Sequence, residues 1–289
     1  MWGVRAWRVT GTVVVVLVMI GAGLQTWSMG VRQRTTSSHP YDIEIHRVQL
    51  STGNASVKVR AGRERHVVVH QRLDWMLRKP VVSATVVDGV LDVSMHCRLI
   101  LPVVDFGCGA EIELEVPAAT EVTGSVGSGT VRVEGLSGPV RLELTSGQLL
   151  LSDTSGDVTV RATSGLVQGD NLSAKRVTAR MVSGTVNLNF ARPPGEVNAA
   201  SVSGSVEMTL PKDSRYAFSS EIGSGNGHIE PLLQDPASPN RVHTEVVSGS
   251  ISIGASASTA PPEPAGAPEP AGTSEPAGTA APARPPSAP

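Results

Sequence analysis

Residues 128–165 read SGTVRVEGL-SGPVRLELT-SGQLLLSDT-SGDVTVRAT-SG, so one nine-residue unit is repeated four times in succession. Each unit opens with Ser-Gly and has apolar residues three and five positions after the serine, such as Val131 and Val133. Side chains two residues apart lie on one face of a β-strand. Each unit is therefore predicted to be a short strand with one buried face. The glycine, which adopts positive φ freely, is predicted to form a corner.

The Ser-Gly pair recurs downstream with a spacing that lengthens slowly. Taking every second early pair, the serines are 18 residues apart between Ser128 and Ser146 and 24 apart between Ser224 and Ser248. A repeat of about twenty residues is typical of a solenoid, whose coils stack about 4.8 Å apart. We expect an all-β solenoid over residues 119–254, with 18–20 residues per coil in its regular part. Its predicted structural corner glycines are Gly129, Gly138, Gly147, Gly156, Gly165, Gly184, Gly204, Gly225 and Gly249.

Residues 165–180 depart from this pattern. Gly169 stands where the repeat requires an inward apolar residue, and so does Arg176. We interpret the departure as a slipped or bulged corner. Residues 191–195 and 232–240 are rich in proline and polar residues and are expected to be loops.

Residues 41–118 alternate between apolar and polar without showing the repeat. Asp88-Gly89 separates two apolar runs, which is a strong signal for a two-residue hairpin. Near the end of this region three glutamates alternate with apolar residues, as in a strand with one wet face: Glu111, Glu113 and Glu115. We expect a small antiparallel β region, preceded by a polar tether over residues 32–40.

The overall composition permits a buried core. The chain has 289 residues, 40% of them hydrophobic and 17% charged, with a formal net charge of −2. These values exclude global disorder and argue against a polybasic nucleic-acid binder, so no nucleic-acid partner is expected. From residue 255 to 289 the chain consists mainly of Pro, Ala, Gly, Glu and Ser, which predicts a disordered tail. The coil that ends with Ile251 and Ile253 is then expected to form an open strand edge.

The amino-terminal region contains an uncharged stretch over residues 9–31. At about 1.5 Å per residue, a helix of this length spans roughly 30 Å of hydrocarbon. We expect a single-pass membrane anchor, with residues 1–8 in the cytoplasm and the rest of the chain outside. The alternative is a signal peptide that is cleaved near Gly21 or Gly23, which would leave a secreted protein.

Known solenoid chemistries require residues that this repeat does not supply. Calcium-binding rolls need an aspartate in successive turns, but only Asp157 directly follows a Ser-Gly pair. His66 and His70 would lie about 13 Å apart along a strand, too far for one metal ion. Glycan cleavage needs carboxylates gathered on one face, and the acidic residues do not recur at coil spacing. We therefore expect no enzyme activity, no catalytic residue, no metal and no cofactor.

The two cysteines, Cys97 and Cys108, flank the connection between two predicted strands. In an exported protein this placement favours a disulfide. Two free thiols are the alternative.

The Ser-Gly-x-Val-x-Val units, following a β region with paired cysteines, resemble the bacterial β-strand-repeat family called "putative adhesin". The stretch from Cys97 through Phe106-Gly107-Cys108 to Glu113-Leu-Glu-Val-Pro117 is similar to the membrane-anchored actinobacterial version. The likeness covers about residues 41–254. It implies an envelope-associated β-solenoid whose relatives are linked to envelope-stress loci, with no family catalytic residues.

Two classes of function remain open. The favoured one is a non-enzymatic, adhesin-like surface or scaffold protein that binds envelope polymer or another protein. The alternative is a sensor or regulator of the envelope-stress response that acts through a membrane partner. An enzyme acting on glycans is a more distant third. The ligand and the oligomeric state are left open by the residues.

We predict that Cys97 and Cys108 are oxidised to one another, because both lie beside one predicted hairpin connection in an exported domain. Mass spectrometry of peptides from the non-reduced protein should find the two cysteines linked. Quantitative alkylation of both thiols without reductant would contradict the prediction.

Overall fold

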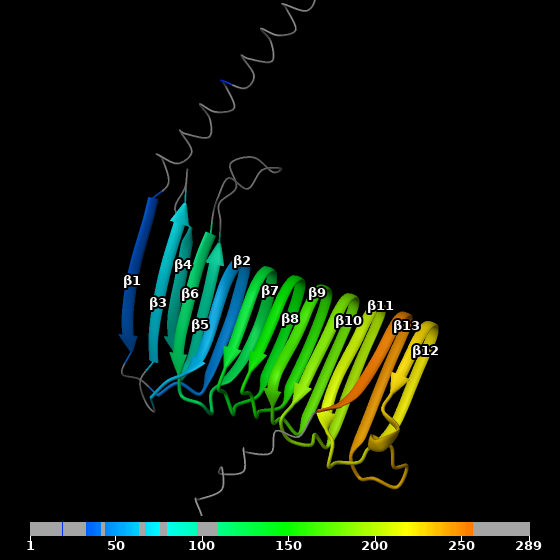
Figure 1. Ribbon diagram of the computed structural model, residues 1–289. Helices are drawn as coiled ribbons and strands as arrows, with labels where there is room; N and C mark the ends of the chain where they lie inside the picture. The colour runs from blue at the N-terminus through cyan, green and yellow to red at the C-terminus, as the bar shows by residue number, and fades with distance from the viewer. Residues whose placement is uncertain are drawn as a thin grey trace, which may run out of the picture. The chain divides into compact units, whose positions relative to one another are not determined.

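The computed structural model describes residues 19, 33–41, 44–63, 67–75, 80–96 and 109–256. Within these residues thirteen strands form one continuous hydrogen-bonded sheet, which confirms the predicted all-β class. Five of the strands follow one another as parallel rows in chain order (Figure 1): β7 (Glu121–Glu134), β8 (Val140–Ser152), β9 (Val158–Leu172), β10 (Arg176–Phe190) and β11 (Glu196–Pro211).

Each of these strands bends round a Ser-Gly corner, so that its two halves form the two sides of one coil (Figure 1). Neighbouring coils are in register: Ser146 pairs with Ser128 on one side and with Ser164 on the other. The repeated unit in the sequence therefore corresponds to half a coil. The predicted coil length and stacking agree with this pairing.

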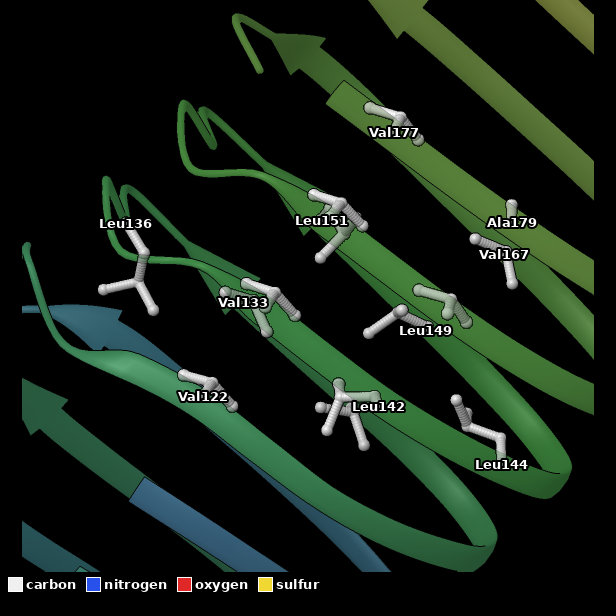
Figure 2. Packing of buried hydrophobic residues seen from close by; sticks show 14 of the residues in the cluster. Val122, Val133, Leu136, Leu142, Leu144, Leu149, Leu151, Val167, Val177 and Ala179 are labelled. Atoms are coloured by element: carbon white, nitrogen blue, oxygen red, sulfur yellow. The ribbon is translucent and has the colours of Figure 1, made fainter. Parts of the chain in front are cut away.

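Both halves of each coil turn valine, leucine or isoleucine inward, and the same position repeats from row to row. One column is formed by register partners on the first half: Val122, Val140, Val158, Val177 and Val197. Facing side chains such as Val133, Leu149 and Leu151 come from the second half (Figure 2). All of these residues are at most 2% exposed, and burying such a side chain contributes about 1.5–3 kcal/mol.

Glycine is required at the corners for two different reasons. Gly147 has φ +153°, and a Cβ on it would lie 2.3 Å from the carbonyl oxygen of Gly129 in the preceding coil. Gly138 and Gly156 do not have a positive φ. A Cβ on Gly138 would nevertheless lie 2.2 Å from a carbonyl oxygen of the preceding row, and a Cβ on Gly156 would lie 1.9 Å from one. At these two positions, the close approach of two backbones excludes a side chain.

The opposite corner of the early coils has a marker that the sequence analysis missed. Gly135, Asp153 and Asn171 have φ of +71°, +53° and +55°, and they stand 18 residues apart. Gly, Asp and Asn are the residues that tolerate this left-handed conformation best. The signal was present in the sequence, but its changing residue type concealed it.

The expected irregularity over residues 165–180 is present as a shift of register. The pairing between β9 and β10 slips after Leu188, so that Phe190 pairs with Leu172. A Cβ on Gly169 would lie 2.6 Å from a methyl carbon of Leu172, which shows that leucine fills the missing inward position. Arg176 points to solvent, and Val177 takes the inward place instead.

The amino-terminal region differs from the expected antiparallel module. β2 (Arg47–Ala61) is a coil of the solenoid, because it pairs in parallel with β7 along its length. On its other side β5 (Val90–His96) and β6 (Gly109–Val116) make a further parallel row. The solenoid therefore begins well before residue 119. The repeat was hidden because Asn54 and Ala55 replace Ser-Gly at the corner of β2, opposite Ser128 and Gly129.

Antiparallel pairing is confined to the first edge of the sheet. There β1 (Gln33–Tyr41) pairs with β3 (Val67–Trp75), β3 pairs with β6, and β4 (Val81–Val87) pairs with β5. Nearly all of the predicted tether is therefore strand β1, which is hydrogen-bonded to β3 from its first residue to its last. Polar composition misled the prediction, because an edge strand can be polar on both faces.

The last coil in the chain is not the last coil in space. β13 (Arg241–Ser256) lies between β11 and β12 (Ala217–Ile229), so the edge row is β12 and the expectation of an open edge at Ile253 is wrong (Figure 1). Burial explains the order: β13 buries Val242, Val246 and Ile251, whereas β12 is mostly exposed and rich in Gly and Ser. A solenoid needs a polar terminal repeat, and β12 supplies it. The 3-10 helix η1 (Pro231–Leu233) follows β12, and its Leu233 is fully buried.

Several predictions fall outside the described residues. These are the Cys97–Cys108 link, His66, residues 257–289 of the predicted tail, and the anchor over residues 9–31 apart from Met19. β13 continues to Ser256, slightly beyond the predicted start of the tail. Among the residues that the structure describes, no helix has the length and hydrophobicity to cross a membrane.

We predict that Gly147→Val destabilises the protein by at least about 3 kcal/mol, because it combines an unfavourable φ with a backbone clash. The matched control is Gly254→Val, since a Cβ on Gly254 meets nothing within 4 Å. That control and the outward substitution Thr159→Ser should stay within about 1 kcal/mol of the parent. Chemical denaturation measures all three variants. Similar unfolding midpoints for Gly147→Val and Gly254→Val would show that the corner does not need glycine.

Candidate functional site

Two adjoining depressions hollow the outer surface of the first coil halves. Their volumes are about 530 and 450 Å³, and they share Ser125, Glu143 and Arg161 in their walls. Together they form a transverse groove, by which we mean the joint depression that crosses rows β2, β7, β8, β9 and β10. The groove is open, shallow and predominantly polar in its residues.

Several residues that line the transverse groove have a short side chain or none. Gly124 stands beside Leu50 of β2, and a Cβ on it would lie 2.1 Å from the Leu50 carbonyl oxygen. Ser51, Ser125 and Thr159 are the other short side chains there. Ser51 and Ser125 are register partners, and the same position on β8 and β9 is occupied by Glu143 and Arg161.

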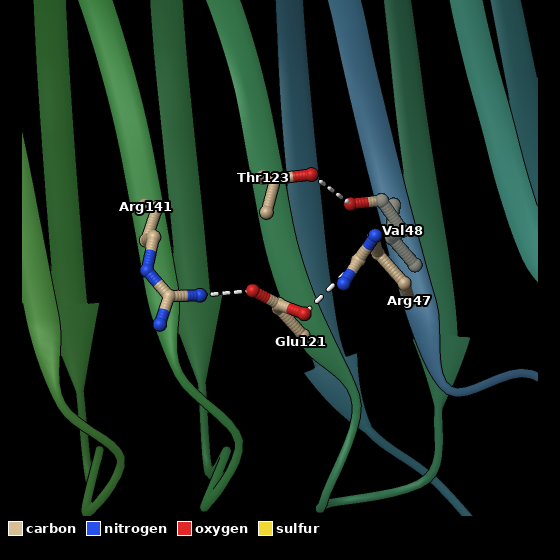
Figure 3. Close-up of polar contacts among 5 residues, drawn as sticks. All are labelled: Arg47, Val48, Glu121, Thr123 and Arg141. Carbon is tan, nitrogen blue, oxygen red and sulfur yellow. Dashed lines mark hydrogen bonds and ion pairs between the residues drawn. The ribbon is translucent and has the colours of Figure 1, made fainter.

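At one end of the groove, Glu121 is shared by two arginines. Arg47 Nε lies 2.9 Å from a Glu121 oxygen, and Arg141 forms an ion pair with the other oxygen (Figure 3). The Glu121 side chain is 17% exposed, against 56% for Arg141. Beside them the Thr123 hydroxyl donates to the Val48 carbonyl oxygen at 3.4 Å, which ties β7 to β2 (Figure 3).

Further along the groove, two arginines lie side by side, and the carboxylates near them do not neutralise both positive charges. Arg161 and Arg180 are register partners on β9 and β10. Arg161 Nη1 lies 3.6 Å from a Glu143 oxygen on the next row, and Arg180 has no ion-pair partner among the described residues. Like charges directly opposite one another destabilise a sheet. This pair is therefore the electrostatically unsatisfied part of the groove.

The opposite surface of the solenoid carries paired carboxylates on β6. Glu111, Glu113 and Glu115, predicted to form a wet face, all lie in ion pairs. Arg72 contacts Glu111 at 2.9 Å, and Arg60 bridges Glu113 and Glu115. Exposed pairs of this kind contribute at most about 1 kcal/mol each. They occupy the carboxylates and provide no acid–base pair.

A similar ion pair fixes the irregular corner. Arg176 Nε lies 3.0 Å from an Asp157 oxygen, and this hydrogen bond with its charge raises the pKa of Arg176. The arginine that breaks the repeat therefore has a structural partner one row away.

The predicted corner glycines of the main series lie in one column along an edge of the solenoid, apart from the groove. Their serines stack beside them, and Ser224 Oγ lies 3.4 Å from Ser248 Oγ.

Within the described part of the chain, no three His, Cys, Asp or Glu residues are placed to hold a metal ion. The groove was not predicted, although the repeat aligns part of it: Arg161 and Arg180 each stand three residues before a serine of the series, Ser164 and Ser183.

Several solved structures match this chain over more than three quarters of its length and over nearly all of their own. A putative cell adhesion protein from Clostridium sporogenes has 15% identity and a TM-score of 0.40, and the match covers 78% of this chain and 100% of that one. A putative adhesin from Parabacteroides distasonis has 14% identity and a TM-score of 0.44, covering 76% and 97%. A putative lipid binding protein from the same organism has 12% identity and a TM-score of 0.25, covering 77% and 97%. The chain has no significant match among curated proteins.

The family comparison agrees with the resemblance seen in the repeat. The model of the Toastrack DUF4097 family matches residues 111–253, which run from β6 through nearly all of β13. The rows β2 and β5 extend the same solenoid beyond the matched segment. Over residues 111–253, just under half of its length, the chain therefore contains a Toastrack DUF4097 domain.

Proposed function

We propose that this protein is a non-enzymatic, adhesin-like binding scaffold anchored in a bacterial membrane, with its solenoid outside the cytoplasm. The observation that carries the proposal is the transverse groove, a depression across five rows in which charged and hydroxyl side chains stand among apolar ones. Binding envelope material requires such a surface and no reacting group.

The construction of the solenoid supports a binding role. Each row is hydrogen-bonded on both sides to its neighbours, so the groove residues sit on a rigid sheet. Preorganised surfaces lose little conformational entropy when a ligand binds. The carboxylates nearest the groove, Glu121 and Glu143, each face an arginine, which suits a structural or recognition role.

The start of β1 supports a close connection to the membrane. β1 begins at Gln33, directly after the uncharged stretch over residues 9–31 and Arg32. A residue extends the chain by at most about 3.6 Å, so an anchor ending at Val31 would hold β1 within about 7 Å of the bilayer. In this arrangement the amino terminus is cytoplasmic and the solenoid stands on the outer surface.

Cellular fractionation tests the anchor. We expect the full-length protein to stay with membranes after alkaline carbonate washing and to be released by detergent, because one uncleaved helix holds it. Intact-mass analysis should then find residues 9–31 present. A washed-off protein that begins after Gly23 would identify a cleaved signal peptide.

Cross-linking in intact cells, followed by purification of the full-length protein, tests the ligand. We expect wall or envelope polymer in the cross-linked product, as judged by its sugar and phosphate content. The matched control is a strain that carries the anchor, residues 1–32, fused to an unrelated soluble domain. A single stoichiometric membrane protein without polymer would contradict the proposal and favour the sensor of envelope stress.

A further inference from the structure

We propose that the transverse groove binds a linear polymer with one phosphate or carboxylate per repeat, and that Arg161 and Arg180 hold one of these anions between them. This inference rests on the proposed function and names the class of its ligand.

The geometry of the two arginines suits one shared anion. Arg161 and Arg180 are direct register partners on adjacent parallel strands, and both side chains line the same depression. Adjacent strands lie about 4.8 Å apart, so two guanidinium groups on one face can approach a single anion from both sides. Guanidinium groups bind phosphate and carboxylate through paired, charge-assisted hydrogen bonds.

The charge balance leaves these donors available. Arg141 already pairs with Glu121, and Arg176 already pairs with Asp157. Arg161 has only the 3.6 Å contact with Glu143, and Arg180 has no ion pair among the described residues. An anion between Arg161 and Arg180 would remove the repulsion between them.

The dimensions of the groove favour a chain over a single small anion. It crosses four row-to-row steps from β2 to β10, which is about 19 Å. Arg141, Arg161 and Arg180 lie along it on three successive rows, with Arg161 directly opposite Arg180 and Arg141 displaced by two residues. Gln49, Ser51 and Thr159 add hydrogen-bonding groups between the cations and the far end. Its lining residues include no aromatic side chain, so recognition depends on charge and hydrogen bonds instead of ring stacking.

The test uses the full-length protein in an uncharged detergent. The probes are fluorescent polyphosphate, fluorescent polygalacturonate and neutral dextran, with binding followed by anisotropy. We expect one or both polyanions to bind and dextran not to bind; the better polyanion identifies the anionic group. Arg161→Gln and Arg180→Gln should each weaken binding about three- to tenfold and reduce the slope of log affinity against log salt by about 1.

Two variants sharpen the test. Glu143→Gln should strengthen binding, because it removes the carboxylate that competes for Arg161. Arg132→Gln is the matched control: it removes the same charge from an exposed arginine on the other half of the β7 coil and should leave affinity unchanged within about twofold. Circular dichroism melting of each variant confirms that the fold is kept.

The inference is wrong if Arg180→Gln and Arg132→Gln bind alike, if neither polyanion binds, or if dextran binds as well as they do. Binding to vesicles of phosphatidylcholine and phosphatidylglycerol without binding to either polymer would also overturn it. The double variant Arg161→Gln, Arg180→Gln separates the two proposals in cells. If it captures as much envelope polymer as the parent protein, the arginine site is wrong but the proposed function still stands. If the parent protein captures no polymer in cells, both the arginine site and the proposed function are wrong.

Discussion

At the corner of each coil the backbone of one row rests directly on a carbonyl group of the next. A Cβ on Gly204 would lie 1.8 Å from the Gly184 oxygen, and a Cβ on Gly249 would lie 1.8 Å from the Gly204 oxygen. No side chain fits in such a contact. Because these corners can stack only on their counterparts, the glycine column fixes the register of both halves of the coils from β7 to β13, whereas β2 has Ala55 at this corner. The inward valine and leucine columns depend on that register.

The same register determines what the surface can do. A one-residue slip would exchange the inward and outward faces of a strand. With the register held, each outward position becomes a row of side chains that runs along the solenoid. The transverse groove follows outward positions of five neighbouring strands, and Arg161 meets Arg180 although they are 19 residues apart in the sequence. The groove is a product of stacking and belongs to no single strand.

The sequence predicted the parts of the fold that a local repeat encodes. Ser-Gly spacing and inward pairs such as Val131 and Val133 give the coil, its corner and its buried face. The order of the coils is not encoded locally. β2 and β13 were misplaced because any coil with the inward pattern can stack on any other, and burial at the ends decides which row lies outermost. The groove was missed for two reasons: its end on β2 depends on that order, and the outward positions of successive coils were not compared, although Arg161 and Arg180 each stand three residues before a serine of the series.

Both ends of the solenoid share one solution to the open-edge problem. A strand that comes earlier or later in the chain is inserted inside the edge: β2 lies between β6 and β7, with β1 and β3 further out, and β13 lies between β11 and the edge strand β12. The outermost rows are then the polar β12 at one end and the antiparallel β1, β3 and β4 at the other. This arrangement places strongly apolar coils where both of their neighbours cover them.

Distance measurement between spin labels tests in-register stacking and row order together. Ser125, Glu245 and Glu221 occupy the same outward position on β7, β13 and β12. With genetically encoded labels, the pair Ser125–Glu245 should be about five row spacings apart, about 24 Å, and the pair Ser125–Glu221 about six, about 29 Å. Narrow distributions with the Glu221 distance longer by about one row are the predicted result. A longer distance to Glu245 than to Glu221, or broad distributions for both, would contradict the stacked order on which the groove depends.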